Sequence, residues 1–296
     1  MNQTLLNQTL ETLNDVLHRA QLLMPSTEQD VDWSAHAYAW HVRHGRGVLH
    51  GLTNPRLFDL SELTAIDRQK QAVIHNTEQF VRGLPANHVL LTGARGTGKS
   101  SLVRACLKQY ADQGLRVIEV EKSDLHDLPH IVDLIRNRSE RFIVFCDDLS
   151  FEHQDVGYKA LKVVLDGSFS GYAENVLVYA TSNRRHLLPE YSSDNIGYRH
   201  PSDEELHPSE PVEEKIALSE RFGLWLSFYP FKQDDYLTIV NQSVARLGWS
   251  ANTDTEKASL REAALQFTLE RGSRSARVAQ HFARQWVGEH LRTAVK

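Results

Sequence analysis

The chain has 296 residues, of which 41% are hydrophobic and 24% are charged, and it carries a formal net charge of −5 with its 15 histidines counted as neutral. This length can bury a sizeable core in one large domain or in a large and a small one. The mildly acidic balance gives no overall electrostatic attraction to nucleic acid or to an anionic membrane. No apolar run is long enough to cross a bilayer and the N-terminus lacks a signal-peptide pattern, so we expect a cytoplasmic protein without membrane contact.

Two helices are predicted in the first part of the chain. In the run LLNQTLETLNDVL, leucines recur at alternating steps of four and three, which is typical of one apolar face of an amphipathic helix. Pro25 ends this helix, and the stretch DWSAHAYAWHVRH predicts a second one that runs to Gly45. We therefore expect a helical N-terminal segment over residues 1–53, whose leucine face packs on the rest of the protein or, as the alternative, binds a partner. His41 and His44 would share a face of the second helix, but no thiol or ordered set of carboxylates completes a metal site.

Residues 54–230 alternate between apolar strands and amphipathic helices. Strands buried on both faces of a parallel sheet are near-continuous apolar runs, and five stretches have this character: VLLT, LRVIEVEK, FIVFC, NVLVYATSN and LWLSFYP. Helical patterns separate them, so we predict an α/β fold in which a parallel five-stranded sheet lies between two helical layers.

Beyond Pro230 the strand patterns stop. Three helical stretches, separated by Gly248 and Gly272, predict a small C-terminal helical domain over residues 231–296. The polar, proline-containing run over residues 190–213 has no apolar period and is predicted to be a loop.

The stretch TGARGTGKSS fits the phosphate-binding pattern G-x-x-x-x-G-K-[ST]. Its glycines let successive backbone N–H groups point at phosphate oxygens, Lys99 supplies positive charge for the outer phosphates, and the Ser100 hydroxyl can ligate magnesium. Because the pattern follows an apolar strand and opens a helix, we predict a nucleoside triphosphate site with Mg²⁺. The residues expected to contact the phosphates are Gly93, Ala94, Arg95, Gly96, Thr97, Gly98, Lys99, Ser100 and Ser101.

Two consecutive carboxylates follow the apolar strand FIVFC. Asp147 is placed to hold the metal ion, directly or through water. Asp148 is predicted to orient or deprotonate the attacking water, although its side chain is one methylene shorter than the usual glutamate. The alternatives are that Asp148 only caps the next turn, or that Glu152 acts as the base.

Polar residues at two further strand and helix ends are candidates for the same site. Asn183 ends the strand LVYATSN, where its amide can hydrogen-bond the attacking water and the γ-phosphate, or can simply form a turn. Arg221 lies just before the last strand and is predicted to reach a phosphate bound in a neighbouring subunit. The alternative for Arg221 is a surface ion pair with Glu220 or Glu214.

Two arginines begin the last predicted helix, in the stretch RGSRSARVAQHF. One arginine at this place would contact the γ-phosphate and report the nucleotide state to the C-terminal domain. The spacing does not choose between Arg274 and Arg277, and the other one is expected to be a solvated charge.

With these features in this order, the chain resembles the AAA+ ATPases, and more closely a bacterial family of AAA+ ATP-binding proteins catalogued as a domain of unknown function. The stretches IDRQKQAVIHNTEQF, VLLTGARGTGKSSLV, FCDDLSFE, YATSNRRHLLPEY and EEKIALSERFGLWLSFYPFKQDDYL carry this resemblance and cover most of residues 60–240. It implies a three-layer αβα P-loop domain with a helical lid, Mg-ATP as ligand, and contacts from Ala65 and Ile66 near the adenine. The glycine loop, Asp147, Asn183, Arg221 and a lid arginine correspond to Walker A, Walker B, sensor 1, arginine finger and sensor 2.

The leading functional hypothesis is an ATPase that couples ATP binding and hydrolysis to remodelling or loading of a macromolecular partner, and that associates with itself through the Arg221 face. The alternatives are a nucleic-acid adaptor similar to helicase loaders, a small-molecule kinase, and an ATP-binding switch with little hydrolysis. The stretches RNRSER and SNRRH offer basic residues to an adaptor, but each is also consistent with a solvated loop.

Overall fold

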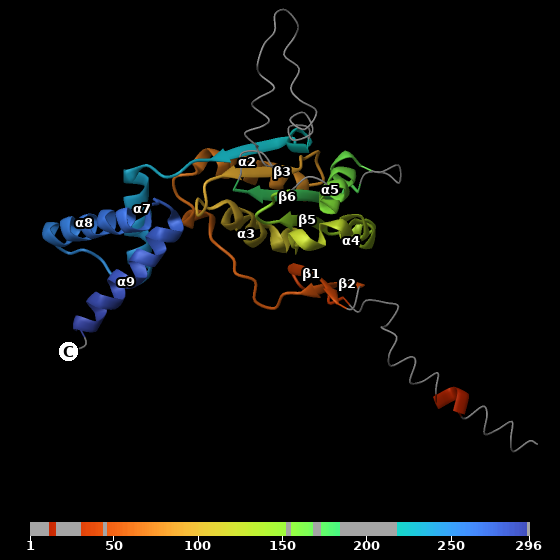
Figure 1. Ribbon diagram of the computed structural model, residues 1–296, viewed down its shortest axis with the longest axis horizontal. Coiled ribbons are helices and arrows are strands. Elements are labelled where there is room, and N and C mark those ends of the chain that lie inside the picture. Colours follow the sequence, from red (N-terminus) through yellow and green to blue (C-terminus); the bar gives the residue numbers. More distant parts are fainter. Residues whose placement is uncertain are drawn as a thin grey trace, which may run out of the picture. The chain divides into compact units, whose positions relative to one another are not determined.

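The computed structural model describes residues 12–15, 31–43, 46–151, 155–167, 173–183 and 218–294 (Figure 1). The chain divides into two compact units, Met1–Asp32 and Trp33–Lys296. In the first unit the described residues 12–15 are helical, whereas most of the leucine-rich run and the predicted loop over 190–213 lie outside the described residues.

Within its described residues, the second unit is built on a seven-stranded sheet with the order β2-β1-β4-β5-β6-β3-β7. The five strands from β3 to β7 are parallel and coincide with the five predicted ones. Side chains of β5 and β6 are buried almost throughout, as their continuous apolar sequences predict. The strands are β1 (Ala37–Arg43), β2 (Arg46–Gly51), β3 (Val89–Gly93), β4 (Leu115–Glu119), β5 (Arg141–Cys146), β6 (Val176–Ser182) and β7 (Leu224–Phe228).

The predicted helix over DWSAHAYAWHVRH is wrong, because this stretch forms strand β1. β1 pairs antiparallel with β2 and parallel with β4, so the sheet has seven strands rather than five. Trp40 is completely buried and donates a hydrogen bond from its indole N–H to Asp127 Oδ2 at 3.1 Å. Aromatic residues favour strands, where they can pack against neighbouring side chains. The edge of β4 on which β1 pairs is a feature of the tertiary structure, and local sequence periodicity cannot reveal it. Residues 37–51 therefore belong to the same sheet as the five predicted strands.

His41, for which a helix face shared with His44 was predicted, consequently lies in a strand and not in a helix. His41 lies in β1, and its ring centroid is 6.5 Å from that of His50 in β2; His44 is outside the described residues. Within the described part of the chain, no group of three or more His, Cys, Asp or Glu side chains is arranged to hold a metal ion.

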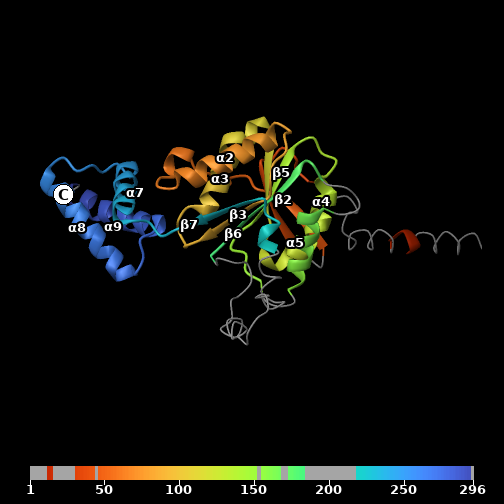
Figure 2. The same cartoon turned by 90° about the horizontal axis from the view of Figure 1, so that it is seen from above.

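Helices cover both faces of the sheet, with α2 and α3 on one side and α4 and α5 on the other (Figure 2). The core on the α3 side includes Leu91, Leu102, Cys106 and Tyr179, each at most 3% exposed. No helix among the described residues is long and apolar enough to cross a membrane. The helices of this part are α2 (Asp67–Val81), α3 (Lys99–Tyr110), α4 (Leu128–Ile135) and α5 (Val156–Asp166), with short 3-10 turns η1 (Leu60–Glu62), η2 (Ala111–Gln113) and η3 (Lys122–Asp127).

Three helices follow the last strand, as predicted: α7 (Gln233–Arg246), α8 (Asp254–Arg271) and α9 (Ala276–Ala294). Gly248 and Gly272 follow α7 and α8 with φ angles of +81° and +63°, which is the left-handed conformation that glycine adopts most easily after a helix. Thr253 and Glu256 form a reciprocal capping box at the start of α8. We refer to α7, α8 and α9 as the lid. The domain boundary at residue 230 remains a prediction, whereas β1 and β2, which precede the predicted boundary at residue 53, are part of the sheet.

A buried histidine at the start of β3 makes the stability of the fold depend on pH. His88 Nδ1 accepts a hydrogen bond from the Val178 backbone N–H at 2.9 Å, and burial lowers the pKa of His88 from 6.5 to about 4. Between these pKa values the unfolded chain binds a proton that the folded chain does not, so the stabilisation is present above pH 6.5 and is lost as the pH falls towards 4.

We therefore expect His88→Gln to lose less stability than the wild type on acidification. From pH 7 to pH 5 the wild type should lose about 2 kcal/mol of unfolding free energy through this one group, whereas glutamine can still accept the Val178 hydrogen bond and does not titrate. Urea unfolding at both pH values measures the difference. His50→Gln, at an exposed position, serves as the control, and an equal acid sensitivity in His88→Gln and wild type would contradict the assignment.

Candidate nucleotide-binding site

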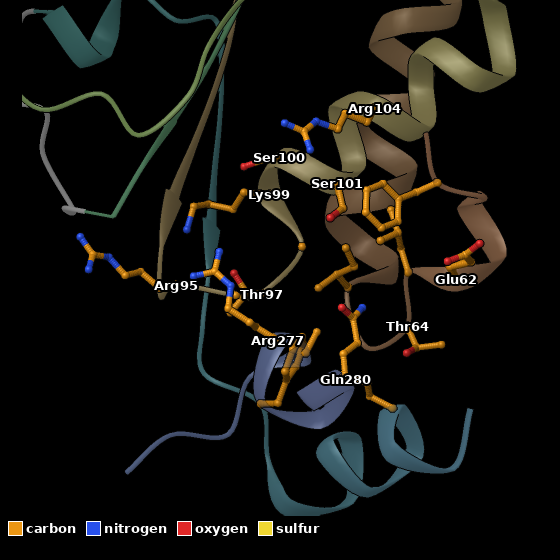
Figure 3. Close-up of a pocket in the computed structure, with 18 of the residues that line it drawn as sticks. Glu62, Thr64, Arg95, Thr97, Lys99, Ser100, Ser101, Arg104, Arg277 and Gln280 are labelled. Carbon is orange, nitrogen blue, oxygen red and sulfur yellow. The ribbon is translucent and has the colours of Figure 1, made fainter. Parts of the chain in front are cut away.

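A cavity of about 650 Å³ lies between the glycine loop, the ends of β5 and β6, the segment around η1, and the lid helices α7 and α9 (Figure 3). Its polar end is lined by the loop residues from Arg95 to Ser101 together with Asp147, Asp148 and Asn183. Leu63, Ile66, Phe231 and Ile239 add apolar side chains to the same lining. The loop residues can therefore receive phosphates, and the apolar side chains can pack against a flat base.

The loop after β3 has a backbone shape that requires glycine at two positions. Gly93 has a φ angle of +121°, and a Cβ atom there would lie 1.9 Å from the Phe228 carbonyl oxygen. Gly96 has a φ angle of +71°, and a Cβ atom would lie 2.9 Å from Oγ of Ser275, the residue directly before α9. α3 begins at Lys99, directly after this loop, so its positive dipole end and its free N–H groups point into the phosphate end of the cavity.

Lys99 is the buried cation of the loop. Its side chain is 6% exposed, and its ammonium group donates to the carbonyl oxygens of Gly93 and Ala94 at 2.7 and 2.8 Å and to Asn183 Oδ1 at 3.2 Å. Burial lowers the pKa of Lys99 to about 8, against the opposing effect of Asp147 and Asp148. A cation held in this way gains from an added anion, because a phosphate compensates the desolvated charge.

The carboxylates after β5 are tied to the loop and to β6. Ser100 Oγ donates to Asp147 Oδ1 at 2.7 Å, and Thr181 Oγ1 donates to the same oxygen. The Asp148 backbone N–H donates to Thr181 Oγ1 at 2.9 Å, and Asn183 Nδ2 donates to the Asp148 carboxylate. Hard oxygen donors from a hydroxyl and a carboxylate, beside a phosphate loop, fit Mg²⁺, which takes few protein ligands and completes its shell with phosphate and water.

Asp148 has a backbone conformation that accounts for the residue type found there. Its φ angle is +53°, in the left-handed region where aspartate and asparagine are enriched among residues with a side chain. Its side chain is exposed and lines the cavity. An aspartate at this position is therefore consistent with the local backbone, whereas a glutamate would be less easily accommodated.

Of Arg274 and Arg277, the two arginines that the sequence offered for contact with the γ-phosphate, Arg277 lines the cavity and Arg274 is not among the lining residues (Figure 3). The first turn of α9 lies against the glycine loop, because the Ala276 backbone N–H donates to the Gly96 carbonyl at 2.8 Å. This contact brings Arg277 to the same end of the cavity as Arg95 and Lys99. The structure thus separates two residues that the sequence spacing left equivalent.

Arg221 does not line this cavity. Its Nε donates to Asp166 Oδ1 at 2.6 Å, so it makes a surface ion pair with a partner other than Glu220, while Glu214 is outside the described residues. The role of Arg221 in a neighbouring subunit remains a prediction. Glu152, the alternative base, lies outside the described residues.

Several lining residues were missed by the sequence analysis. Thr64 Oγ1 donates to Gln242 Oε1 at 3.2 Å, and Arg246 pairs with Glu62 at 2.9 Å; both contacts join the segment before α2 to α7 of the lid. Ile66 lines the cavity as expected, whereas Ala65 is not among the lining residues. No local sequence pattern identifies such lid residues, because they line the cavity only as a result of the packing of the lid helices. Thr181 was also missed, although it stands two residues before Asn183.

The placement of the lid arginines leads to a paired prediction. Arg277→Ala should weaken ATP binding roughly 10- to 100-fold, the loss expected for a hydrogen bond to a charged group, and should weaken ADP binding much less. Arg274→Ala should leave both affinities within about twofold. Equilibrium titration of each variant with ATP and ADP tests this, and equal losses in the two variants would contradict the assignment of Arg277.

The site and the strand order define the class of fold. The phosphate loop follows β3, the carboxylates follow β5 and the polar amide follows β6, in a parallel sheet of order β7-β3-β6-β5-β4 with a helical lid. This is the fold of the AAA+ P-loop ATPases, as the motifs predict. A family model described as a protein of unknown function, DUF815, matches residues 33–290. The chain belongs to this DUF815 family.

Several solved structures are similar to the chain at low sequence identity. The replication initiator DnaA bound to AMPPCP and single-stranded DNA is 15% identical, with 78% of this chain and 65% of that chain covered and a TM-score of 0.50. A DNA replication initiation factor is 16% identical over 78% of this chain and 64% of that chain, with a TM-score of 0.48. The RuvB Holliday junction branch migration motor of Thermotoga maritima is 13% identical over 75% of this chain and 69% of that chain, with a TM-score of 0.41. No curated protein matches the chain.

Proposed function

We propose that this chain is an ATPase that holds Mg-ATP between the glycine loop and the lid and uses its turnover to remodel or load a macromolecular partner. The observation that carries the proposal is one chain of hydrogen bonds at the phosphate end of the cavity, from Lys99 through Asn183 to Asp148. A nucleotide cradle needs only the lysine. The added amide and carboxylate are the groups that hydrolysis requires.

The loop and the lid bind the nucleotide in this scheme. Backbone N–H groups of the loop, the first turn of α3 and the Lys99 ammonium receive the phosphates, and Ser100 and Asp147 hold Mg²⁺. When bound, the metal ion neutralises phosphate charge as a Lewis acid. The apolar end around Ile66 and Phe231 takes the adenine. Arg277 contacts the γ-phosphate from the lid.

Asp148 and Asn183 prepare the water for reaction. Asn183 orients the water beside the γ-phosphate, and the Asp148 carboxylate accepts a proton from it as the water oxygen forms a bond to the γ-phosphorus. The bond between that phosphorus and the β,γ-bridging oxygen breaks, and ADP and phosphate leave. Arg221 of a neighbouring subunit stabilises the charge that develops on the γ-phosphate, so that self-association is part of the catalytic cycle.

The nucleic-acid adaptor gains little support from the described residues. In the stretch RNRSER, Arg136 pairs with Asp133 and Arg138 pairs with Glu140, so most of its positive charge is compensated within the chain. The stretch SNRRH lies largely outside the described residues. Low-salt binding of single-stranded DNA would restore this alternative, because phosphate contacts weaken steeply with salt.

Phosphate release tests the proposed reaction directly. The purified chain, given Mg-ATP and no added acceptor, should release inorganic phosphate continuously over many turnovers. A kinase would form ADP only when its acceptor is added, and it would transfer the γ-phosphoryl group to that acceptor instead of releasing inorganic phosphate. A switch with little hydrolysis would bind ATP and release less than one phosphate per chain over the same period, which would contradict the proposal.

A further inference from the structure

Thr181 on β6 connects the two carboxylates that follow β5. Its side chain is buried, with 2% exposure, and its single hydroxyl group has a partner in each direction. It donates to Asp147 Oδ1 and accepts from the Asp148 backbone N–H at 2.9 Å. One hydroxyl therefore contacts the proposed metal ligand and the backbone of the proposed base.

Each of these two contacts restricts a group that could otherwise adopt another orientation or conformation. Asp147 Oδ1 receives hydrogen bonds from Ser100 on α3 and from Thr181 on β6, and two donors from different elements fix the orientation of a carboxylate more firmly than one. Asp148 has the left-handed φ angle of +53°, which residues with a side chain seldom adopt. The bond from its N–H to Thr181 opposes rotation back to a commoner conformation.

Ser182, on the same strand β6, provides a comparison for Thr181. Ser182, the next residue, is completely buried and donates from Oγ to the Leu149 carbonyl at 2.7 Å. It therefore also ties β6 to the segment after β5, but at Leu149 rather than at either carboxylate. If these hydroxyls served only to hold β6 against the segment after β5, loss of either one should have the same effect on activity.

We propose that Thr181 is a positioning residue for the reaction: its hydroxyl sets the orientation of Asp147 towards Mg²⁺ and the direction of the Asp148 side chain together. This inference rests on the proposed ATPase function. Thr181 does not touch the reacting atoms in this scheme and acts only through the two carboxylates. Valine has nearly the shape of threonine but no hydroxyl, and serine has the hydroxyl but one methyl group fewer.

The test compares Thr181→Val, Thr181→Ser and Ser182→Ala with the wild type. Hydrogen-bonding partners of metal ligands typically change metal affinity or activity about 10- to 100-fold. We expect Thr181→Val to lower kcat by about this factor, with KM for ATP within about threefold, and to raise the Mg²⁺ concentration at half-saturation of fluorescent ATP-analogue binding about tenfold. Thr181→Ser and Ser182→Ala should stay near wild type in both measurements, and thermal unfolding establishes that each variant is folded.

The outcomes separate this inference from the function on which it rests. If Thr181→Val keeps wild-type turnover and Mg²⁺ dependence, or if Ser182→Ala loses as much as Thr181→Val, the positioning role is wrong while the ATPase stands. If the wild type binds the analogue but releases no phosphate, hydrolysis is wrong, and an unchanged Mg²⁺ midpoint in Thr181→Val would still overturn the positioning role. A wild type that binds no nucleotide would overturn both.

Discussion

Asp148→Asn should lower steady-state ATP hydrolysis by about 100- to 1,000-fold, the usual loss on removal of a general base, while Mg-ATP affinity stays within about threefold of wild type. Asparagine is the matched substitution for structural reasons. It tolerates the left-handed conformation that Asp148 adopts, and its amide oxygen can still accept from Asn183. The variant therefore removes the basic carboxylate and little else.

Phosphate release and equilibrium ATP binding, measured on the same preparation, check this prediction. Glu152→Gln is the comparison, because Glu152 is the other carboxylate that follows β5 closely in sequence. A variant Asp148→Asn that retains half of the wild-type rate, together with a large loss in Glu152→Gln, would transfer the role of base to Glu152.

Arg221→Ala should lower ATP turnover by about a thousandfold, the order of magnitude known for arginines supplied by a neighbouring subunit. ATP binding should be unaffected, because Arg221 is not among the residues that line its own subunit's cavity. The wild-type specific activity should rise with protein concentration as subunits associate, and this rise should be absent in the variant. Asp166→Ala, which removes the partner of Arg221 in the ion pair, should retain the rise.

Mixing two inactive variants separates a role between subunits from a structural ion pair. Lys99→Ala lacks the phosphate lysine but keeps Arg221, and Arg221→Ala has an intact cavity but no arginine to donate. Equal amounts of the two should recover a substantial part of the wild-type turnover. Failure of the mixture to exceed the sum of its components would contradict the assignment of Arg221.

The sequence was sufficient for the parts of the fold that depend on local pattern. The five parallel strands and the three lid helices were predicted because the apolar runs of the strands and the apolar periods of the helices are strong. The stretch that forms β1 was predicted as a helix and not as a strand. Its strand pairs with β2 and with the edge of β4, and that edge belongs to the tertiary structure.

In the candidate site, too, some residue positions follow from local sequence pattern and others only from the tertiary structure. Residues of the phosphate loop and the two carboxylates follow strands directly, so their sequence positions largely determine where they lie. Arg277 and Arg274 are three residues apart, and their roles separate only through the contact of the Ala276 N–H with Gly96. The link from Thr181 to Asp147 and Asp148 joins neighbouring strands that are separated by more than thirty residues, and no motif marks it.

Equilibrium binding of ATP to the purified wild-type chain and to Lys99→Ala, each with Mg²⁺ and with the metal chelated, tests the central claim most directly. Lys99 has three hydrogen bonds at the phosphate end of the cavity, and the loss of its charge leaves the outer phosphates without their principal cation. We expect saturable binding of one ATP per wild-type chain, strengthened by Mg²⁺, and no measurable binding to Lys99→Ala. Equal affinity in the two proteins, or no binding to the wild type, would contradict it.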